Sequence, residues 1–181
     1  MANREALREL QNRLAIRLQA ARAEGPSVSW LAIEAGGGRY LIPLAQSGEI
    51  FPWTAIHAVP YTRRWFLGVA NLRGGLWGVV DLADFLGEAG VLSAQTRART
   101  ELALAECSLL ALNAGLEVNV ALLVDRLVGL RSPESFVSSS APAENAPAFL
   151  SGIYTDAQGE SWQEVNLLLL SQTAQFLSIG A

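Results

Sequence analysis

The sequence predicts an antiparallel all-β protein with flanking helices, preceded by an amphipathic N-terminal helix. Short apolar runs recur in pairs around turns that contain glycine or asparagine, which is typical of β-hairpins. No long helical segment joins one run to the next, as a parallel sheet would require. The 181 residues are 51% hydrophobic and 17% charged, which suits one packed domain or two small joined ones.

Residues 3–24 are predicted to form the N-terminal helix, with Asn3 as its cap and Gly25-Pro26 as its end. Apolar residues recur there at intervals of three and four, on one helix face: Leu7, Leu10, Leu14, Leu18 and Ala21. Five arginines against three glutamates make this segment locally basic. The helix either packs on its own domain or docks on a partner or a second copy. We therefore divide the chain into a helix over residues 1–27 and a domain over residues 28–181.

Four hairpins are predicted after the helix. Their paired runs are 30–33 with 39–44, 66–70 with 76–80, 102–112 with 116–124, and 150–154 with 162–170. The remaining segments are an irregular connection over 53–65, a Ser-, Ala- and Pro-rich loop over 132–147, and a terminal helix to about Leu177.

The second hairpin is the organising element. Its connection reads Asn71-Leu72-Arg73-Gly74-Gly75, and its two glycines can take the positive φ of a tight turn. The turn lifts the Arg73 guanidinium to a rigid tip, where its planar fork can meet a carboxylate. Asp81 follows the second strand as the candidate N-cap of a short helix that ends at Gly87.

The composition excludes several classes of function. A net charge of −4 and a pI near 5.0 argue against nucleic acid as the main partner. With one cysteine and one histidine, the chain can form neither an internal disulfide nor a zinc site of the usual four-ligand kind, and no cofactor is implied. No signal peptide opens the sequence, and no apolar run approaches the ~18–20 residues of a membrane span. We expect a cytoplasmic protein without membrane insertion.

No enzyme motif is present in the sequence. His57 has no nucleophile motif near it, and Cys107 lies in an apolar run that favours a buried, unreactive thiol. Residues 36–38 lack the Lys-Ser/Thr of a phosphate loop. The aspartates that could suggest a metal fit helix caps and strand ends better: Asp81, Asp84 and Asp125. The sequence therefore predicts that the protein is not an enzyme.

The central hairpin resembles the signature of CheW-like domains. The residues that carry the resemblance are Gly68-Val69-Ala70-Asn71-Leu72-Arg73-Gly74 and Val79-Val80-Asp81-Leu82, at the family's spacing. Gly78 departs from the pattern, because the family usually has proline there. The resemblance covers about residues 28–178 and implies two small five-stranded antiparallel β-barrels side by side. The predicted N-terminal amphipathic helix is similar to the one that CheW-like proteins from type IV pilus (twitching) systems carry.

The resemblance also implies a function. CheW-like proteins are non-catalytic adaptors, so the expected partners are the regulatory domain of a CheA-type histidine kinase and the cytoplasmic tip of a methyl-accepting chemoreceptor, at membrane-associated arrays. The positions expected to bind a partner are Glu49, Gly68, Asn71, Arg73 and Gly74. Arg73 and Glu49 could instead, or also, pair with each other, and turn geometry alone could explain both glycines. Alternative functions are a small-molecule-binding β-barrel, a hydrolase-like enzyme, or a scaffold that caps arrays without touching a receptor.

Overall fold

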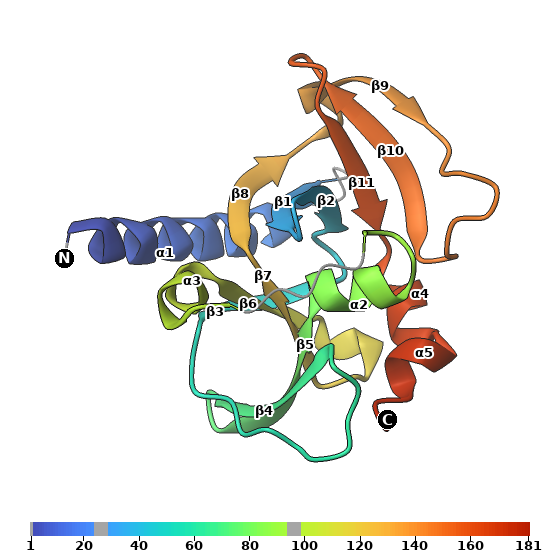
Figure 1. Ribbon diagram of the computed structural model, residues 1–181. Helices are drawn as coiled ribbons and strands as arrows, with labels where there is room; N and C mark the ends of the chain where they lie inside the picture. Colours follow the sequence, from blue (N-terminus) through green and yellow to red (C-terminus); the bar gives the residue numbers. More distant parts are fainter. Residues whose placement is uncertain (1, 24–28, 94–98) are drawn as a thin grey trace.

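Two mixed β-sheets, rather than two closed antiparallel barrels, form the framework of the protein (Figure 1). The computed structural model describes residues 2–23, 29–93 and 99–181. Sheet A has the strand order β8 (Arg126–Arg131), β1 (Trp30–Ala35), β2 (Gly38–Pro43), β11 (Ser161–Val165), β10 (Leu150–Asp156), β9 (Phe136–Ser140). Sheet B has the order β3 (Ser47–Pro52), β6 (Ser108–Leu112), β7 (Val120–Val124), β5 (Gly75–Asp81), β4 (Phe66–Leu72).

The prediction of purely antiparallel sheets was wrong at two places. Strand β2 pairs with β11 in parallel, and β5 pairs with β7 in parallel. Both pairs join strands from different hairpins, so their direction follows from packing between distant segments rather than from a turn. The sheets are not closed barrels, because the first and last strands of each order are not paired with each other.

The antiparallel pairing within the predicted hairpins is confirmed for β1–β2, β4–β5, β6–β7 and β10–β11. The third hairpin starts later than predicted, because residues 101–106 form helix α3 (Glu101–Glu106), capped by the Thr100 side chain. The predicted loop over 132–147 holds the 3₁₀ turn η2 (Pro133–Ser135) and edge strand β9. The other elements are α2 (Leu82–Glu88), η1 (Ala114–Leu116), α4 (Leu167–Gln172) and α5 (Ala174–Leu177).

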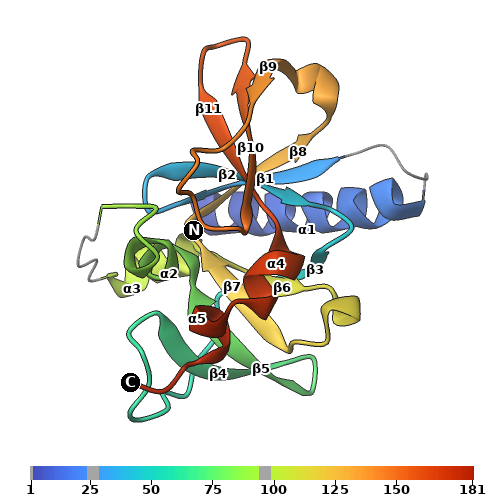
Figure 2. The ribbon, with the colours of Figure 1, turned by 90° about the vertical axis from the view of Figure 1, so that its right-hand side faces the viewer.

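The N-terminal helix α1 (Ala2–Ala23) packs on its own domain, next to β3 and β8 (Figures 1 and 2). Leu14 and Leu18 are buried in the main core, whereas Leu10 is 46% exposed. The Gln11 side chain donates a hydrogen bond of 2.9 Å to the Ser108 hydroxyl at the start of β6. The predicted stripe is therefore buried only in part, and the side chain of Ala21 lies outside the described residues.

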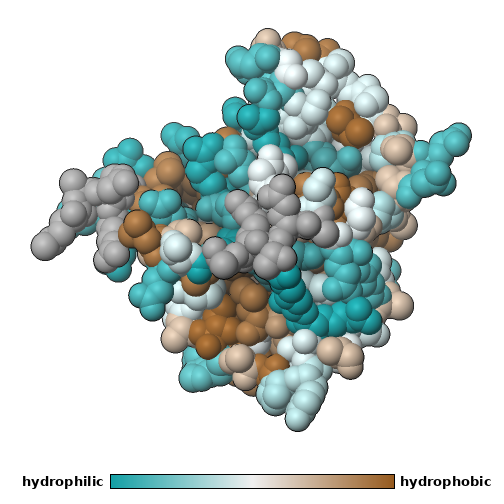
Figure 3. All heavy atoms as spheres, in the orientation of Figure 1, coloured by the Kyte–Doolittle hydropathy of each residue, from teal (hydrophilic) through white to brown (hydrophobic). Residues whose placement is uncertain are grey.

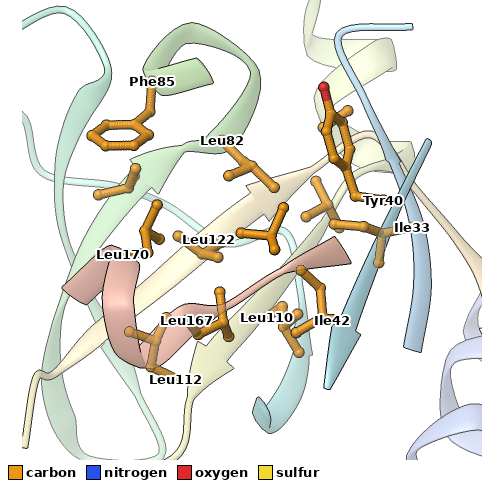
Figure 4. Close-up of a cluster of buried hydrophobic side chains, with 14 of the residues drawn as sticks. Ile33, Tyr40, Ile42, Leu82, Phe85, Leu110, Leu112, Leu122, Leu167 and Leu170 are labelled. Atoms are coloured by element: carbon orange, nitrogen blue, oxygen red, sulfur yellow. The ribbon is translucent and has the colours of Figure 1, made fainter. Parts of the chain in front are cut away.

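One hydrophobic core joins the two sheets (Figure 4). Besides Leu14 and Leu18 of α1, it includes residues from β1 and β2, from β6 and β7, and from the helices α2 and α4: Ile33, Tyr40, Ile42, Leu110, Leu122, Leu82, Phe85, Leu167 and Leu170. Burying one such leucine or isoleucine contributes roughly 1.5–3 kcal/mol. The shared core fixes the sheets relative to each other and so holds the exposed ends of sheet B in place.

Candidate functional site

The tip of the β4–β5 hairpin is a two-residue turn made of Arg73 and Gly74. Both residues have positive φ, 49° and 81°, as in a type I′ turn. The Asn71 side-chain oxygen accepts a 2.9 Å hydrogen bond from the Gly74 amide, which fixes the turn from the strand below. Gly75 was predicted to belong to the turn, but it pairs with Leu72 and begins β5. Glycine at position 74 is explained by its φ alone, since a Cβ there would meet open space.

Glu49 is turned toward this tip by a β-bulge in β3. Ser47 pairs with Leu112 and Ile50 with Leu110, so Gly48 and Glu49 together oppose one residue of β6. Such a bulge re-aims the side chains at its position. Glu49 lies in β3, a strand that the four predicted hairpins did not include.

Arg73 and Glu49 form an ion pair, with 2.6 Å between Arg73 Nη2 and Glu49 Oε1. Strands β3 and β4 are at opposite edges of sheet B, so the pair connects the two edges across the curled sheet. The Arg73 side chain is 74% exposed, and that of Glu49 is 36% exposed. The site thus presents one cation, on the hairpin turn, and one anion, on β3, at the surface.

Gly68 lies toward the other end of β4, away from this tip. Its φ is 133°, and a Cβ added to it would come within 2.1 Å of the His57 carbonyl oxygen. The backbone of His57 pairs there with Val69, with hydrogen bonds of 2.8 and 2.9 Å. Close approach of two backbone segments therefore requires glycine at this position. The structure brings Glu49, Asn71, Arg73 and Gly74 together and leaves Gly68 apart.

A second cluster of charges, which the sequence did not predict, is centred on Arg99. Its guanidinium lies 3.0 Å from Asp81 Oδ1 and 2.6 Å from Asp125 Oδ1, and it donates a hydrogen bond of 3.0 Å to the Cys107 sulfur. The Arg99 side chain is only 11% exposed. Asp125 also accepts a hydrogen bond from the Gly36 amide at the β1–β2 turn, so the cluster ties sheet A to sheet B. Sequence patterns marked the two aspartates separately, but nothing near Arg99 indicated that it would join them.

Asp81 has a second role in this cluster. Its side chain accepts hydrogen bonds from the amides of Ala83 and Asp84 and so confirms the predicted N-cap of α2. Burial raises the pKa of Asp81, and the neighbouring Arg99 guanidinium opposes that rise. Burial likewise raises the pKa of the Cys107 thiol, against the influence of Arg99. The thiol therefore stays protonated near neutral pH and is a poor nucleophile.

His57 is exposed and is held there through its backbone pairing with Val69. Within residues 2–23, 29–93 and 99–181, no group of three or more His, Cys, Asp or Glu side chains is placed to hold a metal ion. Across the same ranges, no helix is long and apolar enough to cross a membrane.

The protein combines two mixed sheets around a shared core with a charged hairpin tip. The CheW-like domain family matches residues 29–175, and the chain belongs to that family. Along nearly its whole length it is similar to Protein PilI of Pseudomonas aeruginosa, with 28% identity over 171 residues that cover 93% of this chain and 89% of PilI.

A further relative and a solved structure are also similar to this chain. A probable chemotaxis protein CheW of Rhizobium etli is 35% identical over 57 residues, which cover 32% of this chain and 37% of the relative. The crystal structure of the scaffolding protein TtCheW from Thermoanaerobacter tengcongensis superimposes with a TM-score of 0.63 at 17% identity. That match covers 83% of this chain and 96% of TtCheW, and it supports the two-sheet fold.

Proposed function

We propose that this protein is a non-catalytic adaptor that couples a methyl-accepting chemoreceptor to a CheA-type histidine kinase in a type IV pilus (twitching) pathway. Membership of the CheW-like family supports the adaptor role, and the similarity to PilI over 93% of the chain supports the pilus pathway. The protein acts in the cytoplasm, at receptor arrays on the membrane.

The conformation of Arg73 is the observation that carries the proposal. A residue with a Cβ is strained in the left-handed region, and asparagine or glycine is preferred at this position of a type I′ turn. Strained residues of this kind cluster at functional sites. The Arg73 side chain makes an exposed ion pair, which is typically worth only ~0–1 kcal/mol. The small stabilisation from this ion pair does not explain why arginine stands at this position. Recognition of its charge by a partner explains it better.

In this proposal Glu49, Asn71, Arg73 and Gly74 form the partner-facing site. Glu49 orients the Arg73 guanidinium, and Asn71 and Gly74 hold the turn that carries it. Gly68 contributes indirectly, since it lets the His57 segment pack on β4. The protein transmits a signal by contacting its partners differently in two states of the assembly, without lowering a chemical barrier.

Affinity purification from the source cell, followed by mass spectrometry, tests the proposal. We expect a histidine kinase and a chemoreceptor to co-purify with the wild-type protein, and the receptor to be depleted with the Arg73→Asn variant. Recovery of the kinase without any receptor would instead support a scaffold that caps arrays. If neither partner is enriched over a control purification, the adaptor function is wrong.

A further inference from the structure

A hollow of about 340 Å³ opens beside β4, at the end of the β4–β5 hairpin away from the Arg73 turn. Its walls are largely apolar and come from the connection after β3, from β4 and from α3: Trp53, Ile56, Leu67 and Leu104. Its polar end is formed by Asp81, Asp84 and Arg99. Figure 3 shows hydrophobic side chains gathered at the surface in this part of the molecule, between the positions of α3 and β4 in Figure 1. Hollows of this size, apolar with a few polar groups, are typical binding sites.

The backbone around the hollow is fixed by two irregular features of β4. Phe66 pairs with Val80 and Gly68 with Val79, so Leu67 is an extra residue in a β-bulge. The bulge changes the direction of the Leu67 side chain, which lines the hollow. Beside it, the close approach at Gly68 seats the backbone of His57 on β4, next to the wall residue Ile56. Backbone pairing thus fixes the chain on which the wall residues Ile56 and Leu67 lie.

The polar end carries more negative than positive charge. Arg99 is already neutralised, because it contacts the carboxylates of both Asp81 and Asp125. Asp84 is 15% exposed and lies 3.4 Å from Nε of Arg64, whose own side chain is 55% exposed. An ion pair with so exposed an arginine is weak and open to competition from another cation. Glu101 and Glu106, exposed on α3, add further negative charge on this side of the sheet.

We propose that this hollow binds an arginine side chain presented by a protein partner. The alkyl part of the arginine packs between Ile56 and Leu67, its guanidinium lies on the Trp53 ring, and its N–H groups donate to Asp84. A planar guanidinium suits both the ring and the carboxylate better than a lysine ammonium does. The inference does not depend on the proposed adaptor function, since it rests on the shape and charge of this hollow alone.

Titration of the full-length protein with N-acetyl-arginine amide tests the site, with the Trp53 indole signal and the Leu67 and Asp84 amide signals followed by ¹H–¹⁵N NMR. N-acetyl-citrulline amide is the matched control, because it has nearly the same shape but no charge. We expect saturable shifts of these signals with the arginine probe, and about tenfold weaker binding of the citrulline probe. The Trp162 indole, in sheet A, should not move. Equal binding of both probes, or no saturable shift, would overturn the proposal.

Two variants separate the role of Asp84 in binding from that of its ion-pair partner Arg64. Asp84→Asn should weaken binding of the arginine probe about tenfold, whereas Arg64→Gln should strengthen it because a competing cation is removed. Both variants break the same ion pair, so a mere loss of that pair would change binding equally in both. If Asp84→Asn retains wild-type binding, or if Arg64→Gln weakens it as much as Asp84→Asn does, the assignment of Asp84 is wrong. Unchanged amide spectra outside the hollow show that each variant is folded.

Discussion

Arg73 and Arg99 are both paired with carboxylates, but they differ in exposure, at 74% and 11% of the side chain. An exposed pair is screened by water, whereas removal of one partner from a buried pair leaves an uncompensated charge. We therefore expect replacement of Arg73 to affect partner binding and replacement of Arg99 to affect stability.

Arg73→Asn should keep or slightly raise the melting temperature and should weaken receptor–kinase assembly. Asparagine tolerates positive φ, and loss of the exposed pair costs only about 0–1 kcal/mol. Loss of a charge contact at an interface costs about 2–5 kcal/mol. Thermal melting and reconstituted ternary assembly are measured on one preparation of the variant.

The exchanged double variant Glu49→Arg/Arg73→Glu is the control for this prediction. It keeps an ion pair between the same positions but reverses the charges that a partner would meet. Assembly should stay weak if a partner recognises the positive charge of Arg73. Full recovery of assembly in the double variant would show that only the internal pair matters.

Arg99→Met should destabilise the protein by about 3–5 kcal/mol, because Asp81 and Asp125 lose the cation between them. Arg126→Met is the matched control: Arg126 also bridges two strands, through Glu34, but its side chain is 65% exposed. The control should cost no more than about 1 kcal/mol. Denaturant unfolding measures both, and equal losses in the two variants would contradict the structural role given to Arg99.

Cys107 should resist alkylation by iodoacetamide in the folded protein at neutral pH. The residue is 3% exposed, and burial raises the pKa of its thiol, so little reactive thiolate is present. Full modification is expected in denaturant, measured by mass spectrometry. Rapid modification of the native protein would show that the region around Arg99 opens readily.

At the scale of the element, α1 shows which part of an apolar stripe stabilises the fold. Leu18→Ala should cost about 2–5 kcal/mol, because Leu18 is 2% exposed in the main core. Ile16→Ala, two residues away and 66% exposed, should change stability by less than about 0.5 kcal/mol. Denaturant unfolding compares the two. Similar small effects would mean that α1 is not docked on the domain in solution.

Elements defined by local chemistry could be predicted from the sequence, and elements defined by their neighbours could not. The turn at Gly36-Gly37, the cap at Asp81 and the periodic leucines of α1 each act within a few residues. Helix α3 was missed because its leucines continue the apolar run of β6, although the cap at Thr100 was a signal for it. Strand β9 was missed because its three serines are exposed and its hydrogen bonds come from β10.

The candidate site follows the same rule. The Arg73 turn could be predicted because its signal lies in adjacent residues. The Glu49 pair remained one of two open interpretations, since it needs the curvature of sheet B to bring the two strand edges together. A backbone contact explains why Gly78 departs from the family pattern. Its amide donates a hydrogen bond of 2.9 Å to the Asn119 carbonyl beside β7, and proline has no such donor.

At the scale of the whole molecule, the parallel pairs join distant hairpins within each sheet, and the Arg99 cluster ties the two sheets to each other. Neither could be predicted from one sequence, because each joins residues that are distant in the chain and no local pattern indicates which of them meet. The Arg39–Glu160 ion pair, between β2 and the start of β11, spans 121 positions. Contacts of such long range make folding slow, since a large loop must close before they form.

The central place of β2 in sheet A has a consequence for the protein as the ribosome makes it. Strand β1 emerges just before β2 and covers one of its edges at once, but β11 covers the other edge only after Val165 has been synthesised. Until then the nascent chain carries an unpaired, apolar strand edge, which is a template for association with other chains. Chains stalled before residue 161 should therefore be bound by chaperones, whereas chains released after β11 should be able to complete sheet A.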